Sequence, residues 1–249
     1  MLSVLFFCVL LFASQRNDIQ TQRQTLAGTT TFLLYITTCL WQINRFPKEK
    51  IMPIICLTGG LAAGKSTAAQ YFAEQGAEII DADKLGHETY EAGSPANDQI
   101  VAAFGPEVRA DDGSIDRKVL GSKVFGQPDA LKQLTDIVWP EIRTLAEARC
   151  QAVSDQDPKA IVVLEAAVLF EAGWEDIGDE VWVVTAELEV VIDRAINRDG
   201  LTREAIEARL NSQLSNTERR AKADFVIENN TDQETFKANL ATAWARIDG

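Results

Sequence analysis

One eight-residue segment constrains this chain more than any other. Residues 59–66 read GGLAAGKS, which matches the phosphate-loop pattern G-x-x-x-x-G-K-[ST]. An apolar run at 53–58 precedes the loop and an amphipathic run follows at about 65–75, so a buried strand and a helix are predicted on its two sides. Small residues let backbone N–H groups approach phosphate oxygens, and the positive end of the helix dipole attracts the same anion. The segment therefore predicts a nucleotide phosphate site in an α/β fold.

The loop residues have separate expected tasks. Lys65 is expected to reach the β- and γ-phosphates, and the Ser66 hydroxyl is expected to ligate Mg²⁺. Ala62 and Ala63 stand where many such loops have glycine or serine, and at a positive φ either Cβ would cost about 1 kcal/mol. The residues expected to bind ATP here are Gly59, Gly60, Leu61, Ala62, Ala63, Gly64, Lys65, Ser66 and Thr67.

The rest of the chain alternates apolar and amphipathic segments. Further strands are predicted at 77–83, 160–170 (a strand and its exit), 180–186 and 223–229, and further helices at 187–199, 201–215 and 232–246. Thr202 is a predicted N-cap without a full capping box, because Ala205 stands where the box needs Glu or Gln. Residues 84–155 show helical periodicity and no convincing strand. Together these segments predict a parallel five-stranded sheet covered by helices on both faces.

Composition limits the class of protein. The chain has 249 residues, of which 46% are hydrophobic, enough for one large domain or a core with an inserted lobe. A net charge of −13 argues against a nucleic-acid binder, since such proteins usually present a basic face. A single histidine, His87, excludes a multi-histidine metal site. The cysteines form no CxxC pair, which predicts a reducing compartment, no disulfide framework, and Cys56 as a small core residue.

Residues 1–51 differ in character from residues 52–249. Basic residues outnumber acidic ones in the first segment, whereas acidic residues are in excess in the second. The opening MLSVLFFCVLLFAS has signal-peptide length but no basic n-region, and a second apolar run lies at 31–41. Two interpretations stay open: a targeting segment or membrane anchor, or a start assigned too far upstream, with Met52 as the first residue. We expect a cytoplasmic protein, with organelle targeting or a membrane tether as alternatives. The sequence does not predict the oligomeric state.

A phosphate loop does not by itself separate a GTPase, an ATPase motor and a small-molecule kinase. The guanine signature N-K-x-D is absent, and no long motor architecture follows the apolar strand that runs into Glu165. Arginines recur instead: Arg194 and Arg198 share one helical face, and Arg203 and Arg209 follow. Arginines on a mobile arm neutralise charge on a transferring phosphoryl group and exclude water. The alternative is a solvated basic stripe paired with nearby acids.

Seven segments, in the right order, resemble the dephospho-CoA kinase family and especially the kinase domain of the animal bifunctional CoA synthase. They are LTGGLAAGKST (57–67), IIDADKLGHETY (79–90), GSIDRKVLGSKVFG (113–126), LTDIVWPEIR (134–143), VLEAAVLFEAGW (163–174), RAINRDGLTREAIEARLNSQ (194–213) and ADFVIENN (223–230). Glu165 departs from the family, which usually has Asp there. No nucleotidyltransferase domain precedes residue 53, so the resemblance implies a kinase alone.

This resemblance implies a reaction and an architecture. The family uses ATP and Mg²⁺ to phosphorylate the ribose 3′-hydroxyl of dephospho-CoA, which gives CoA and completes its biosynthesis. The implied fold is a P-loop kinase core with a helical acceptor-binding lobe and a small helical lid. Within a kinase domain at 52–249, residues 84–155 fit the lobe and residues 198–220 fit the lid.

The residues and the resemblance together suggest a catalytic base. A ribose hydroxyl is a poor nucleophile, so a carboxylate should accept its proton. Asp83 is expected to leave the C-terminal edge of a strand beside the phosphate loop, where ligands bind in open α/β sheets. The resemblance makes Asp83 the base. Asp81 is the nearer alternative and a candidate for acceptor binding, or else a turn or cap carboxylate.

The resemblance also places Thr58 near the reacting phosphate, where the alternative is a strand-end hydroxyl satisfied by backbone. It places Arg194 on a phosphate and Arg198 on ATP from the lid. Arg209 and Gln213 match further lid positions.

Two residues of the predicted lobe are candidates for the acceptor. His87 would line the acceptor pocket, although a lone histidine more often packs or faces solvent. Arg117 would meet an acceptor phosphate, or would pair with Asp112 or Asp116 at a helix start.

Two other functions stay open. One is a different small-metabolite kinase on the same core, since the strandless lobe decides the acceptor. The other is a membrane-tethered regulatory protein that binds CoA or ATP, which the intact catalytic set argues against. We expect ATP and dephospho-CoA as partners, and neither nucleic acid nor membrane.

Overall fold

The computed structural model describes residues 53–200 and 202–247. The predicted N-terminal extension, residues 1–51, lies outside the described residues. Within the described part of the chain, no helix combines the length and the apolar character that crossing a membrane requires.

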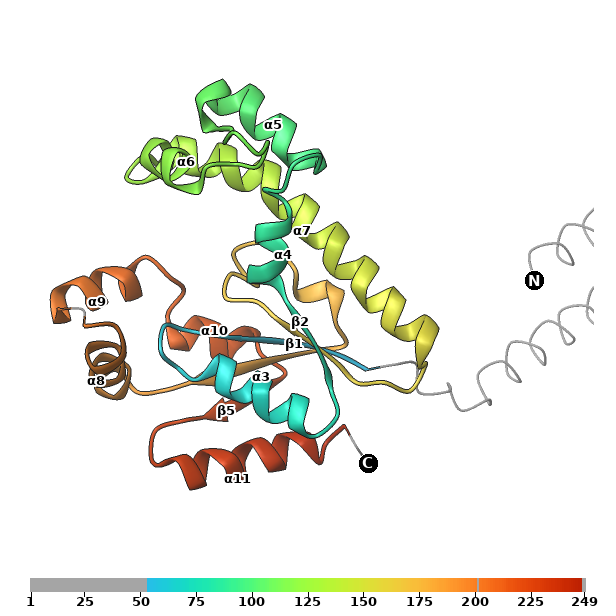
Figure 1. Cartoon of the computed structure of the whole chain (residues 1–249). Helices are drawn as coiled ribbons and strands as arrows, with labels where there is room; N and C mark the ends of the chain where they lie inside the picture. Colours follow the sequence, from blue (N-terminus) through green and yellow to red (C-terminus); the bar gives the residue numbers. More distant parts are fainter. Residues whose placement is uncertain (1–52, 201, 248–249) are drawn as a thin grey trace, which may run out of the picture. The chain divides into compact units, whose positions relative to one another are not determined.

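Five parallel strands form one sheet at the centre of the described domain (Figure 1). They are β1 (Ile54–Gly59), β2 (Glu78–Asp81), β3 (Val162–Glu165), β4 (Glu180–Thr185) and β5 (Phe225–Glu228), in the spatial order β2-β3-β1-β4-β5. Every neighbouring pair is parallel, so all carboxyl ends meet at one edge. The predicted five-stranded parallel sheet is confirmed. Because β1 is the middle strand, the phosphate loop that follows it starts at the centre of that edge.

Side-chain caps begin most of the helices. The helices are α3 (Lys65–Glu74), α4 (Ala82–Glu88), α5 (Pro95–Phe104), α6 (Arg117–Val124), α7 (Pro128–Gln156), α8 (Leu188–Asp199), α9 (Arg203–Asn211), α10 (Asn216–Lys222) and α11 (Gln233–Trp244), with 3-10 turns η1 (Pro106–Val108) and η2 (Glu175–Ile177). Thr202 caps α9 as predicted, because its hydroxyl accepts the Ala205 N–H at 3.3 Å. The capping side chains of the other helices are Asp81 (α4), Ser94 (α5), Asp116 (α6), Ser215 (α10) and Asp232 (α11).

The two faces of the sheet hold separate cores, because successive strand residues point to opposite faces. On one face, Leu57 and Trp182 pack with Phe72 of α3 and Leu240 of α11, and the Trp182 and Phe72 rings meet edge to face at 5.5 Å. On the other face, strand residues such as Cys56 pack beneath α4 and α7. Figure 1 shows α3 and α11 on one side of the sheet and α4 and α7 on the other. Both faces are therefore covered, as an all-parallel sheet requires.

Residues 84–155 form helices α4 to α7. The β-pairing in this segment is one isolated bridge between Arg109 and Ile115. The long helix α7 packs against α4, α5 and α6 and then continues onto β2 and β3 (Figure 1). Two contacts fasten its middle to the turn η2. The Trp139 ring meets Trp174 edge to face at 6.5 Å, and Arg143 donates to both oxygens of Asp176 at 2.8 and 3.0 Å. Helix α7 therefore joins the helical segment to the sheet.

A small third cluster joins α8 and α9 to the phosphate loop. Ile192 and Ala195 of α8 pack with Ile206 of α9, and Leu61 and Ala62 of the loop pack against them. The conformation of this helical pair is therefore tied to that of the loop.

The helix predicted over 201–215 is wrong in its extent. Helix α9 ends at Asn211, and a separate helix, α10, begins after Ser215. The Ser215 hydroxyl accepts the Glu218 N–H, and the Glu218 carboxylate accepts the Ser215 N–H. This capping box starts a new helix.

Cys56 is a core residue, as predicted. It has no exposed surface, and burial raises the pKa of its thiol to about 12, so the thiol stays protonated and unreactive at neutral pH. Gly178 lies directly over it: a Cβ added there would sit 2.7 Å from Cys56 Sγ and 2.8 Å from the Ile54 carbonyl oxygen.

We expect Gly178→Ala to lower the free energy of unfolding by about 1–3 kcal/mol, because the methyl group overpacks a buried site. Gly121→Ala in α6 is the matched control, since a Cβ there meets nothing within 4 Å. Alanine at that helical position should stabilise the protein by up to about 1 kcal/mol. Urea unfolding measures both variants, and equal effects would show that the contact over Cys56 imposes no constraint.

Candidate active site

The phosphate loop has two residues at positive φ. Gly64 has φ 105°, which suits glycine, and Ala62 has φ 50°. A Cβ in the left-handed region costs about 1 kcal/mol, so Ala62 is held in a mildly strained conformation. The tight turn Ala63 N–H to Gly60 O (3.2 Å) and the packing of Ala62 against the α8–α9 cluster hold it there. Such strain is typical of functional loops that the surrounding structure over-determines.

Helix α3 begins within this loop and presents its N-terminus. Gly64 is its N-cap residue and supplies no side-chain cap. The first N–H groups of a helix have no intrahelical acceptor, so they are available to a bound anion.

A buried carboxylate lies beneath the loop. Glu165, the last residue of β3, is 7% exposed, and its Oε1 accepts both Lys65 Nζ at 2.8 Å and Ser66 Oγ at 2.9 Å. A buried carboxylate needs such partners to offset its lost hydration. The pair of Ser66 and Glu165 also offers two hard oxygen atoms side by side, the ligand type that Mg²⁺ prefers.

These residues fit a Mg²⁺ ion that arrives with a nucleotide. Within the described residues, no three His, Cys, Asp or Glu side chains form a metal-ligating group. Magnesium in phosphoryl-transfer sites commonly has one or two protein ligands and takes the others from phosphate and water. Ser66 would be its protein ligand here, and Glu165 would orient the Ser66 hydroxyl.

A cavity of about 850 Å³ opens over the loop. Its lining brings together loop residues 59–67, Asp83 of α4, Arg194 and Arg198 of α8, and Gln213 from the segment after α9. Residues from well-separated parts of the sequence therefore converge on one site. The cavity-lining residues that the sequence analysis missed are Ala167, Asn197, Asn229, Gln233 and Phe236. Asn197 follows Arg194 by three positions on α8, a spacing that could have indicated it.

The two aspartates of the DAD segment face different cavities. Asp83 lines the large cavity, but it lies in the first turn of α4 rather than at the end of a strand. The strand predicted over 77–83 ends at Asp81, because the Asp81 carboxylate accepts the N–H groups of Asp83 (3.0 Å) and Lys84 (3.2 Å) and starts the helix. Asp81 lines a second cavity of about 570 Å³, together with Glu165. The cap interpretation of Asp81 is therefore confirmed.

The arginines that follow β4 differ in their contacts. Arg194 donates through Nη2 to Asn229 at 3.0 Å, and its Nη1 is buried without a hydrogen-bond partner in the described structure. Arg198 pairs with Asp199 at 2.7 and 2.8 Å, while one of its faces lines the cavity. Arg203 pairs on the surface with Glu189 and Glu207, and Arg209 is not a cavity-lining residue. The solvated-stripe interpretation thus describes Arg203 and also the pairing of Arg198 with Asp199, whereas Arg194 reaches the site.

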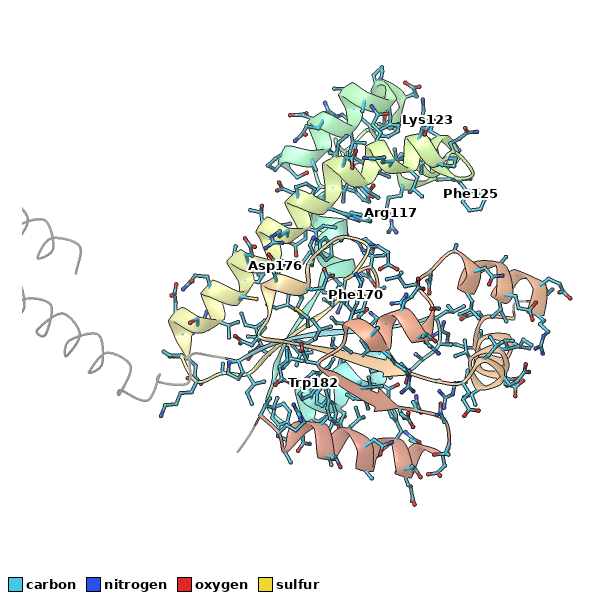
Figure 2. The ribbon with its side chains drawn as sticks, turned by 180° about the vertical axis from the view of Figure 1, so that it is seen from behind. Arg117, Lys123, Phe125, Phe170, Asp176 and Trp182 are labelled. Carbon is cyan, nitrogen blue, oxygen red and sulfur yellow. The ribbon has the colours of Figure 1, made fainter. Side chains whose placement is uncertain are left out.

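Three predicted site residues, Thr58, His87 and Arg117, line neither cavity. Thr58 is fully buried, and its hydroxyl lacks a partner among the described residues, so the prediction that the backbone could satisfy it is wrong. His87 is exposed on α4. Arg117 is exposed at the start of α6 and makes no ion pair with Asp112 or Asp116. In Figure 2 its side chain extends from the helical segment toward the core.

The fold and the cavity define a class of protein. A phosphate loop follows the central strand of a parallel sheet, and an aspartate and arginines from other elements line the same cavity. This combination is typical of the P-loop kinases.

The chain belongs to the dephospho-CoA kinase family, whose sequence pattern matches residues 53–235. It is 42% identical over 196 residues to the dephospho-CoA kinase of Moorella thermoacetica (79% of this chain, 92% of that protein). It is 43% identical over 195 residues to that of Geobacter sulfurreducens (78% of this chain, 98% of that protein). The chain therefore has the ATP-dependent activity of this family, the final step of coenzyme A biosynthesis.

Two solved structures are similar to this one. A Thermus thermophilus protein is 32% identical with a TM-score of 0.66, over 80% of this chain and 100% of that chain. A dephospho-CoA kinase from Campylobacter jejuni is 32% identical with a TM-score of 0.61, over 78% of this chain and 96% of that chain. The family and fold predicted from the sequence are thus confirmed.

We expect Lys65→Ala to lower both the affinity for ATP and kcat, the latter by about 100-fold or more, because an electrostatic contact to the phosphates is lost. Lys237→Ala, an exposed lysine on α11, is the control. Calorimetric ATP titration and steady-state kinetics measure the two effects. Retention of both affinity and rate in Lys65→Ala would contradict the assignment of the loop.

Proposed function

We propose that the chain transfers the γ-phosphoryl group of ATP to the ribose 3′-hydroxyl of dephospho-CoA, with Asp83 as the general base. The observation that supports this most directly is the shared cavity: Asp83, Arg194 and the phosphate loop line the same space. A base for the acceptor hydroxyl must lie within reach of the phosphate that the hydroxyl attacks. Asp83 has an exposed carboxylate on a helix whose start is fixed by the Asp81 cap.

In this proposal the chain's residues divide the work. The loop N–H groups and Lys65 bind the β- and γ-phosphates. Asp83 takes the proton from the 3′-hydroxyl as the new O–P bond forms and the bond to the ADP oxygen breaks. The unpartnered Nη1 of Arg194 donates to the equatorial oxygens of the transferring group. Arg198 approaches ATP from the lid, residues 198–220.

Mg²⁺, when bound, would neutralise part of the charge of the phosphates. Ser66 would ligate it, and Glu165 would orient Ser66 through the 2.9 Å hydrogen bond. Thr58 belongs beside the reacting phosphate in this proposal, since its buried hydroxyl has no acceptor among the described groups and a ligand oxygen would supply one.

The acceptor side of the proposal rests on the helical lobe, about 84–155. Arg117 is exposed, extends toward the core without an ion pair to its neighbouring acids, and would meet a phosphate of dephospho-CoA. His87 and Asp81 are the other proposed acceptor residues. The proposal gives the chain two small-molecule partners and a cytoplasmic location, with no role for nucleic acid or a membrane.

We expect ADP release from the full chain with ATP and Mg²⁺ to require dephospho-CoA and to yield CoA. Adenosine and AMP serve as competing acceptors, and a chelator should abolish the reaction. Release with another acceptor would keep the kinase core and overturn the acceptor assignment. A folded chain that binds ATP but releases no ADP would favour a regulatory protein. Repeating the assay on residues 52–249 tests whether residues 1–51 are dispensable.

We expect Asp83→Asn to cut kcat by about 100-fold or more while ATP affinity stays nearly unchanged, because the amide cannot accept the proton. Asp81→Asn is the paired variant: asparagine caps a helix as well as aspartate does. That variant should act mainly on KM for dephospho-CoA. Steady-state kinetics with ATP titrations separate the two. The opposite pattern would make Asp81 the base.

A further inference from the structure

The side chain of Asn229 joins two parts of the phosphate site. Asn229 follows β5, and its N–H donates to Thr185 O at 2.8 Å, which continues the pairing with β4. The residue is 6% exposed and lines the large cavity. Its Nδ2 donates to the Ala63 carbonyl at 2.8 Å, and its Oδ1 accepts from Arg194 Nη2 at 3.0 Å. Both polar ends of the amide are therefore occupied.

The first contact orients the phosphate loop. Ala63 C=O and Gly64 N–H belong to one trans peptide group, so they point in opposite directions. When Asn229 holds the Ala63 carbonyl, the Gly64 N–H is held on the opposite side of the peptide plane. This N–H donates to none of the described groups. The fit is close, since a Cβ added to Gly64 would lie 2.4 Å from Asn229 Nδ2. The hydrogen bond from Asn229 thus opposes a flip of the Ala63–Gly64 peptide group.

The second contact orients Arg194. A long arginine side chain loses conformational freedom when it is fixed, so a prior hydrogen bond reduces the cost of fixing it on a ligand. With Nη2 on Asn229, the remaining Nη1 is buried and without a protein partner in the described structure. The guanidinium is held in place with one donor group still free.

The chemistry of the two partners calls for an amide. A carbonyl oxygen needs a donor and a guanidinium needs an acceptor, and a primary amide supplies both. Aspartate would place an acceptor against the Ala63 carbonyl. Leucine has a similar size but would leave both partners unsatisfied.

We propose that Asn229 is a positioning residue for phosphoryl transfer: its one buried amide fixes the Gly64 N–H and Arg194 in a single arrangement around the phosphates. This inference rests on the proposed function for the role of Arg194. It assigns Asn229 no contact with the reacting atoms.

The test compares Asn229→Leu with Asn230→Leu in the full chain. Asn230 is the adjacent residue, and its side chain accepts the Glu187 N–H at 2.9 Å without lining the cavity. We expect Asn229→Leu to weaken ATP binding, measured by calorimetry, by about 10- to 100-fold, and to lower kcat as well. Asn230→Leu should change ATP affinity by less than about threefold. Thermal unfolding should show both variants folded.

Coupling to Arg194 separates positioning from a general loss of structure. In an Arg194→Ala background, we expect the effect of Asn229→Leu on ATP affinity to shrink at least about threefold, because one of its two partners is gone. Additive effects, or equal losses of affinity in Asn229→Leu and Asn230→Leu, would overturn the proposal. The ATP readout is independent of the acceptor. A wild-type chain that binds ATP but does not phosphorylate dephospho-CoA would overturn the proposed function and still leave this comparison decisive.

Discussion

The buried carboxylate of Glu165 is the interaction on which the site depends. It draws Lys65 and Ser66 onto one oxygen atom and lies at the end of β3, where Leu57 of β1 and Asp81 of β2 are its neighbours in register. Removing a carboxylate from water is costly, and the cost is offset here by a cation and a hydroxyl group. Those two groups are also the ones proposed to bind the phosphates and the metal ion of the nucleotide. The ion pair thus holds Lys65, the lysine proposed to bind the phosphates, in an ordered position.

Around Glu165 the sheet is the rigid support, and the segments that follow the strands carry the side chains that line the cavity. The end of each strand sets where the chain leaves the sheet, and the helix cap sets where the following helix begins. Asp81 illustrates the point: its carboxylate starts α4, and this start places Asp83 in the cavity beside the phosphate loop. The contact of Ala62 with α8 and α9 extends the same arrangement to α8, the helix that carries Arg194 and Arg198. The proposed lid and the loop therefore share a packing surface.

Local patterns in the sequence predicted the sheet and the loop well, since apolar runs, glycine positions and the Lys-Ser pair act over a few residues. The break between α9 and α10 was missed although Ser215 and Glu218 have capping-box spacing. The distinction between Asp81 and Asp83 depends on which carboxylate turns back to the backbone, which a strand pattern does not encode. Asn229 could not be assigned because its partner Ala63 is 166 positions away. Contacts across that separation exist only after the sheet has formed.

Helix α7 connects the sheet to the proposed acceptor lobe. It is held at Trp139 and Arg143, while α5 and α6 pack along its N-terminal half. From Arg143 back to Pro128 the helix extends about 22 Å at 1.5 Å per residue, so a tilt of about 10° at the held point moves its far end by about 4 Å. That displacement exceeds the diameter of a water molecule. A tilt of this size about the held point would change the width of the proposed acceptor side by a full solvent layer.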